Sequence, residues 1–373
     1  MIRRQFLLST GVAGALAGRD WNEDPNYKVV TRYRPSPRYD LPGRVVRVHA
    51  AASIVETTAQ ADPAVVREMM AQGLTRLTGD KDYRDSWRRF VGPQDVVGIK
   101  VNASGAPKIM SHPVVVGEIA RCLTEVGVKP ANICVYERFP DQLESIGYEK
   151  YLPASVKVLA VEPRRNMIRE YDPYTYVEAN FFGEEDTRSN LIRMVAERFT
   201  KIVNVPNMKD HGASGVTGCL KNIAYGNFHN VARSHAFTKT HTKTFIGKLA
   251  AVEPLRSRTV LHVMDGLKSI WHGGPFERSP KFAFFPKQMM FGTDPVAVDR
   301  IMRDVIEGKR KGMGAVSVFD RSMETTKDVK AMDPNKNRYI REPGHIEFAA
   351  TQGLGIVDMA KIKLEEIRLG DRA

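Results

Sequence analysis

The stretch Asn204–Asn222, with the sequence NVPNMKDHGASGVTGCLKN, is the part of the chain that decides most about its fold. The mainly apolar run Ile202–Val205 leads into it, and three glycines are interspersed among its polar residues. This pattern is typical of a buried strand that delivers a polar loop, and we expect the loop to open a short helix. Ligands of open α/β sheets bind at the carboxyl ends of strands, so the sequence predicts a binding site here.

A helix that begins near Ser214 or Gly215 would carry its apolar residues on one face, against the sheet. Thr217 and Lys221, four residues apart, would share another face and point into a crevice. The free amides of residues 215–217 would then form an anion site, supported by the helix dipole and by the charge of Lys221. A glycine-rich turn with polar capping groups explains the same residues without a ligand.

Outward from this tract, strand patterns alternate with helix patterns along the chain. This alternation predicts an α/β fold with a mainly parallel sheet, helices on both faces, and insertions. The expected strands are 45–55, including the exit of that strand, 96–101, 133–136, 156–161, 202–205, 259–264 and 289–291. The expected helices are 63–77, 113–126 and 295–306, and residues 191–199 form an amphipathic stretch before the strand 202–205.

The N-terminus has the pattern of an export signal. Paired arginines, Arg3-Arg4, precede a mild apolar stretch and a small-residue cleavage pattern, Ala15–Ala17, which resembles a twin-arginine signal peptide. A basic N-terminus without a targeting role is the alternative. We expect the translocation machinery of that pathway as a partner, a periplasmic or otherwise exported location, and no membrane span in the mature chain. The predicted organisation is a signal peptide at 1–17, a linker or surface-draped segment at 18–43, and one α/β domain at 44–373 with an insertion or loop at 307–345.

Charge and cysteine content exclude several classes of protein. The formal net charge is +13, but the basic residues are scattered, so we expect no nucleic-acid partner. Attraction to an anionic small molecule or envelope surface, or simply a solvated basic surface, explains the charge. The three cysteines, Cys122, Cys134 and Cys219, form no Cys-x-x-Cys pair, so we expect neither a disulfide framework nor an intrinsic four-cysteine iron–sulfur cluster.

The candidate catalytic residues are His211, Lys209 and Asp265. Lys209 and Lys221 would fix the negative charge of a substrate, while His211 would act as general acid/base or as a metal ligand. A metal ion, if there is one, would be held by His211, Asp265 and Asp299, although Asp299 could equally be a surface charge. The predicted substrate-binding residues are Lys100, Asn102, Thr217, Lys221, Asn222, Gly273 and Gly274.

Several of these segments, taken in order, resemble the domain of unknown function 362 family. The matching stretches are Val97–Asn102, Ile133–Val135, Asn204–His211, Gly215–Asn222, Met264–Gly266, Gly273–Pro275, Thr293–Asp299 and Gly353–Gly355. The resemblance covers roughly residues 95–360 and implies an α/β domain with a largely undefined role. Some members carry a ferredoxin-like segment with clustered cysteines, which this chain lacks. Redox chemistry is implied by that association alone.

Two hypotheses follow for the function. The first is an exported enzyme, with a metal or cofactor or without one, that acts on an anionic small molecule in a composite polar crevice. The second is a non-catalytic envelope protein that binds an anionic ligand. No Gly-x-Ser-x-Gly elbow, Walker loop or dinucleotide-binding fingerprint supports a standard hydrolase, nucleotidase or dinucleotide enzyme.

Overall fold

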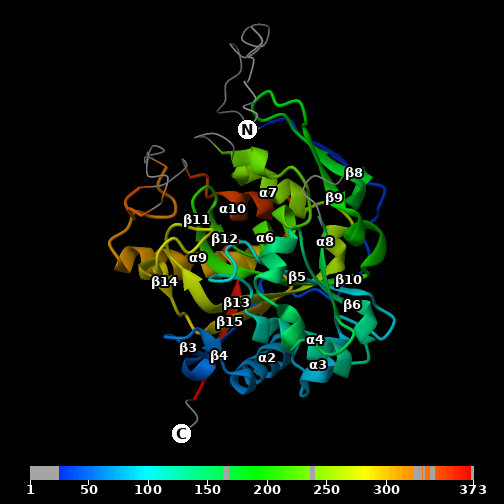
Figure 1. Cartoon of the computed structure of the whole chain (residues 1–373), viewed down its shortest axis with the longest axis vertical. Helices are drawn as coiled ribbons and strands as arrows, with labels where there is room; N and C mark the ends of the chain where they lie inside the picture. Colours follow the sequence, from blue (N-terminus) through cyan, green and yellow to red (C-terminus); the bar gives the residue numbers. More distant parts are fainter. Residues whose placement is uncertain are drawn as a thin grey trace, which may run out of the picture.

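A large twisted sheet separates two layers of helices in the computed structural model (Figure 1). The structure describes residues 25–162, 168–235, 240–321, 330, 332–336 and 341–370. The predicted signal peptide, 1–17, lies outside the described residues, as do residues 18–24. No helix in the described part of the chain is long and apolar enough to cross a bilayer.

The eleven-stranded sheet has the main order β16-β2-β15-β13-β10-β5-β6-β7. Along this path only β15 runs antiparallel to its neighbours, which confirms the predicted mainly parallel sheet. Three further strands extend it, because β11 and β14 pair with β13 and β12 pairs with β11. The strands are β2 Arg44–Ala50, β5 Val97–Val101, β6 Ile133–Glu137, β7 Lys157–Ala160, β10 Lys201–Val205, β11 Asn207–His211, β12 Gly215–Thr217, β13 Thr259–Ile270, β14 Ala283–Phe284, β15 Gln288–Gly292 and β16 Lys363–Leu369.

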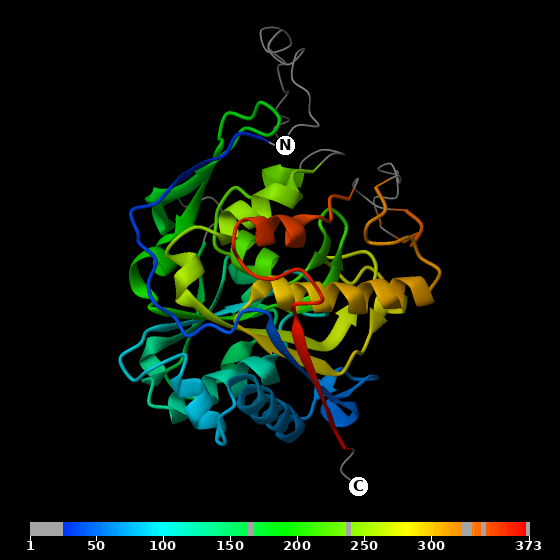
Figure 2. The same cartoon turned by 180° about the vertical axis from the view of Figure 1, so that it is seen from behind.

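Helices cover both faces of this sheet, as the alternating pattern predicts (Figure 2). One layer is built from α2 Pro63–Thr78, α3 Tyr83–Arg88 and α4 Pro113–Glu125. The other contains α6 Cys219–Tyr225, α7 Thr242–Ala250, α8 Leu255–Arg258, α9 Pro295–Gly312 and α10 His345–Thr351, and a short α5, Pro140–Glu144, follows β6. Two hydrophobic cores result, one on each side of the sheet.

Local sequence signals set the ends of the helices well. The carboxylate of Asp62 accepts hydrogen bonds from the amides of Ala64 and Val65, Pro63 occupies the first turn, and α2 ends at Gly79 with a left-handed φ of 86°. Asp294 caps α9 in the same way through the amide of Ala297.

A separate three-stranded sheet lies beside the main one. It consists of β1 Lys28–Val30, β8 Tyr171–Glu178 and β9 Arg188–Ile192, and a short hairpin, β3 Ile54–Val55 with β4 Gln60–Ala61, follows β2. Strand β1 belongs to the segment 18–43, expected to be a linker or a surface-draped segment, and it pairs antiparallel with β8. The side chains of Thr31 and Arg38 then bond to backbone carbonyls of residues 253–259.

The predicted helix from near Ser214 or Gly215 is wrong. Residues 215–217 form β12, which pairs antiparallel with β11, and α6 begins only at Cys219. The predicted end of the strand at Met264 is also wrong, because β13 continues to Ile270 and pairs with β11. The extended β13 gives β11 a neighbour, so residues that look like a loop in sequence become a strand in the fold. Gly215, with a φ of 82°, permits the tight return into β12.

Candidate functional site

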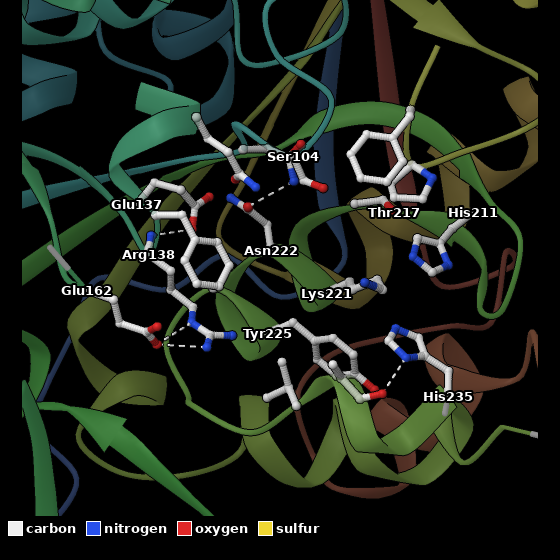
Figure 3. Close-up of a pocket in the computed structure, with 18 of the residues that line it drawn as sticks. Ser104, Glu137, Arg138, Glu162, His211, Thr217, Lys221, Asn222, Tyr225 and His235 are labelled. Atoms are coloured by element: carbon white, nitrogen blue, oxygen red, sulfur yellow. Dashed lines mark hydrogen bonds and ion pairs between the residues drawn. The ribbon is translucent and has the colours of Figure 1, made fainter. Parts of the chain in front are cut away.

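A cavity of about 610 Å³ lies at the carboxyl ends of the parallel strands (Figure 3). One wall comes from residues that end or follow β5, β6 and β7, and the other from β11, β12 and α6. This is the edge of the sheet at which the sequence places the site. The polar residues that line it include Asn102, Ser104, Glu137, Arg138, Glu162, His211, Thr217, Lys221, Asn222, Tyr225 and His235.

The hairpin of β11 and β12 brings three of the predicted residues onto one face. Side chains alternate along a strand, so Lys209 and His211 share a face, and Thr217 lies directly opposite Lys209 in the register. Asp210 points the other way, where its carboxylate accepts bonds from Arg310 at 3.3 Å and Arg341 at 3.0 Å. The hairpin, not a helix, therefore gathers the polar residues of the tract.

The carboxylates at the cavity are neutralised within the protein. Glu137 receives a hydrogen bond from the Lys100 amino group at 2.8 Å, and Glu162 receives one from Arg138 at 2.8 Å. Lys100 is fully buried and also donates to the carbonyl of Val101 at 2.6 Å. Burial lowers its pKa, and the Glu137 carboxylate opposes that shift. Lys100 is thus tied into the wall of the cavity and is not free to meet a ligand.

Amide side chains connect the pair of Lys100 and Glu137 to the rest of the site. Asn222 accepts from Asn102 at 3.3 Å and from Lys100 at 3.4 Å, and donates to the side chain of Asn204 at 2.8 Å. The structure therefore brings Lys100, Asn102 and Asn222 together at one edge of the sheet. The buried side-chain oxygen of Asn102 has no hydrogen-bond partner in the part of the chain that the structure describes, and a bound polar group would satisfy it.

Two lysines near the cavity have no carboxylate partner among the described residues. Lys221 lines the cavity with its amino nitrogen 4.3 Å from the ring centre of Tyr225. Burial lowers its pKa to about 7, and Glu137 opposes this shift only at longer range. Lys209 lies behind the wall and donates to the carbonyl of Ser104. Burial, reinforced by the charge of Lys221, lowers its pKa to about 7.

His211 is held as a neutral hydrogen-bond donor. Its Nδ1 accepts from the amides of Ala213 at 3.2 Å and Ser214 at 3.3 Å, so the proton lies on Nε2. Burial and the nearby cations keep its pKa well below the usual range. Its ring stacks on His235 at 6.0 Å, and both rings line the cavity. A neutral His211 with its proton on Nε2 suits a hydrogen-bond donor to an anion. It suits the predicted general acid/base less well, because protonation of Nδ1 would break the bonds that this nitrogen accepts from backbone amides.

Asp265 and Asp299 bind backbone amides and lie outside the cavity lining. Asp265 accepts from the amides of His112 at 2.6 Å and Leu267 at 3.0 Å, which holds the start of α4. Asp299 accepts from the first two amides of α6, at 2.5 and 2.9 Å, and burial raises its pKa to about 7. The anion at this helix terminus is therefore a side chain of the protein. In the described part of the chain, no three His, Cys, Asp or Glu side chains are grouped to hold a metal ion, so His211, Asp265 and Asp299 do not form the predicted metal site.

Gly274 packs against β11, and neither Gly273 nor Gly274 is among the residues that line the cavity. A Cβ at Gly274 would lie 1.7 Å from the carbonyl oxygen of Asp210, and its amide donates to the Asp210 carboxylate at 3.1 Å. Gly273 has a φ of 80°, which allows the turn. The residues that follow them, Pro275 and Phe276, do reach the cavity.

Glu137, Arg138 and Glu162 also line the cavity, but they are not among the site residues predicted from the sequence. Each ends or directly follows a strand that the sequence predicts, β6 or β7. The rule that places ligands at strand ends, applied to those strands as well, would have found them. Tyr225, at the end of α6, has no comparable sequence signal.

The fold and the cavity define an α/β protein with a polar site at the carboxyl edge of a mainly parallel sheet. The chain belongs to the family described as a domain of unknown function (DUF362), whose model matches residues 97–304. A solved structure of a Thermotoga maritima protein is similar to it with a TM-score of 0.41 and 11% identity, over 67% of this chain and 59% of that chain. This chain thus spans about three fifths of that protein. None of the curated proteins matches it.

Proposed function

We propose that this protein is exported and binds an anionic small molecule in the cavity between β11, β12 and the ends of β5–β7, as an enzyme. The observation that carries the proposal is an imbalance of charge. Glu137 and Glu162 are already paired, whereas Lys221 and Lys209 have no carboxylate partner among the described residues. Among the described residues, one lysine thus lines the cavity and another lies behind its wall, and neither is paired with a carboxylate.

Burial of an unpaired ammonium group is unfavourable, and an anion beside it offsets that cost. An anionic group next to Lys221 would lie within reach of the cavity-lining side chains of Thr217 and His211. Only 3% of Thr217 is exposed, and its buried hydroxyl has no hydrogen-bond partner among the described residues. The Nε2–H of His211 would add a neutral donor. Lys221, His211 and Thr217 together make an anion-binding set.

The same set supports catalysis, because donors that are fixed in a partly buried site stabilise negative charge that develops on a substrate. Lys209 would act from behind the wall through its charge. The second candidate is a non-catalytic envelope protein that captures an anionic ligand with these same groups. Turnover of a bound ligand separates the two, since the binding protein would release it unchanged.

Isothermal titration with inorganic phosphate and with lactate tests the anion site. Lys221→Met should weaken binding at pH 6.5 by about tenfold or more, because it removes a charge-assisted bond. Lys150→Met, at an exposed lysine in η3 (Tyr148–Tyr151), is the matched control and should bind as the wild type does. Wild-type affinity should fall at pH 9, where Lys221 and Lys209 lose their protons. Equal affinity of Lys221→Met and wild type would refute the proposal.

A further inference from the structure

We infer that Lys221 is a nucleophile that forms an imine with the carbonyl carbon of a small acidic carbonyl compound, such as a 2-oxo acid. The inference rests on the proposed anion site and names the class of molecule that it takes.

The three lysines have different bonding. Lys100 donates to Glu137 at 2.8 Å and to a backbone carbonyl at 2.6 Å, so its nitrogen is held as a donor. Lys209 donates to the carbonyl of Ser104. Lys221 alone among these three lines the cavity, and within the described residues its nitrogen makes no hydrogen bond and no ion pair. Its lone pair is therefore available once the proton has left.

The environment of Lys221 supplies the free amine at neutral pH. With a pKa of about 7, close to half of the side chains are neutral at pH 7, against roughly one in three thousand for an ordinary lysine. Burial is an established way to activate a lysine, and it is burial that lowers the pKa of Lys221, against the opposing charge of Glu137.

The chemistry balances without an oxidant or a further reactant. The Lys221 nitrogen forms a bond to the carbonyl carbon, the carbonyl π electrons move to oxygen, and an ammonium proton passes to that oxygen, which gives a carbinolamine. The hydroxyl then leaves with the remaining amine proton as water, and a C=N bond remains. The donors at Thr217 and His211 would hold the acidic group of the compound, so that the carbonyl lies at Lys221.

The cavity walls fit a small acid of this kind. Tyr225, Phe139 and Phe276 supply aromatic surface beside Lys221 and across the cavity, while the acidic groups Glu137 and Glu162 are paired. The cavity holds about 610 Å³, which admits a compound larger than the simplest 2-oxo acids.

The experiment uses the full-length protein, glyoxylate as the probe, and sodium cyanoborohydride at pH 7 to reduce any imine to a stable secondary amine. Peptide mass spectrometry then gives the extent of labelling at each lysine. We expect labelling at Lys221 to exceed that at exposed Lys150 by about tenfold or more. Lys221→Arg should lose that label, whereas Lys150→Arg should keep it. Glycolate, which lacks the carbonyl, should compete with glyoxylate and leave no label.

Labelling of Lys221 no faster than that of Lys150 in the folded wild-type protein would overturn the inference, and this comparison holds even if Lys221→Arg fails to fold. The two proposals fail separately. If phosphate and lactate bind but Lys221 gains no selective label, the anion site stands and the imine does not. If neither anion binds and Lys221 is not labelled, both are refuted. Selective labelling without phosphate or lactate binding would support the nucleophile and refute the general anion site.

Discussion

Replacement of the fully buried Lys209 by methionine should make the protein more stable at neutral and acidic pH. Lys209 is covered completely, and within the described part of the chain its amino group donates one hydrogen bond, to the carbonyl of Ser104. A fall of its pKa from 10.5 to about 7 corresponds to about 5 kcal/mol of unfavourable free energy for the charged form. Loss of the bond to Ser104 costs about 1–2 kcal/mol. Methionine has a similar length, so we expect a net gain of about 2–4 kcal/mol at pH 6.

The pH dependence of the stability difference between Lys209→Met and wild type shows whether the lowered pKa of Lys209 causes it. The unfolded lysine keeps its proton up to about pH 10, whereas the folded one loses it above about pH 7. The unfolded wild-type chain therefore binds more protons between these values, and wild-type stability rises with pH relative to Lys209→Met. Below pH 7 the gap between the two proteins should be constant. From pH 7 to pH 9 it should shrink by about 2–3 kcal/mol.

Urea unfolding of both proteins at pH 6, 7, 8 and 9 measures this gap. Lys150→Met is the control, since a change at an exposed lysine should give a small difference that does not vary with pH. A gap between wild type and Lys209→Met that stays flat from pH 7 to pH 9 would show that Lys209 does not carry a lowered pKa. A saturating anion should reduce the gap, because it offsets the buried charge only in the wild type.

Three further results are expected. Asp299→Asn should destabilise the protein by about 1–3 kcal/mol in urea unfolding, because the asparagine side chain has one oxygen where the carboxylate has two, and one oxygen cannot replace both bonds to the backbone amides of α6. Unchanged stability would contradict the capping role of Asp299. Gly274→Ala should cost about 3 kcal/mol or more or prevent folding, since its Cβ would lie 1.7 Å from a carbonyl oxygen of β11. Gly308→Ala, in α9 with open space around it, is the control and should stabilise by up to about 1 kcal/mol; equal effects at the two glycines would refute the packing argument. Replacement of Arg3 and Arg4 by lysine should retain the protein in the cytoplasm on cell fractionation, and unimpaired export would argue against the twin-arginine route.

Much of the site could be located from sequence because strand ends are a local signal. Asn102 follows a mainly apolar run of residues, and the tract that contains Lys209 and His211 follows another such run. These residues do gather at one edge of the sheet. The roles assigned to Asp265 and Asp299 depended on partners that sequence does not reveal, and each carboxylate proved to hold the start of a helix far away in the chain.

The sequence by itself determined the α/β class, the mainly parallel sheet and the edge at which polar groups collect, since periodicity, caps and strand ends depend on neighbouring residues. Only the tertiary structure decided that Asn207–Thr217 is a hairpin, because its first strand, β11, pairs with β13, whose residues lie more than 50 positions away in the chain. It also decided which lysine is paired. Lys100 meets Glu137, 37 positions away, and Lys221 meets no carboxylate among the described residues. A charge is neutralised by whatever the fold places beside it, and that is fixed by long-range contacts.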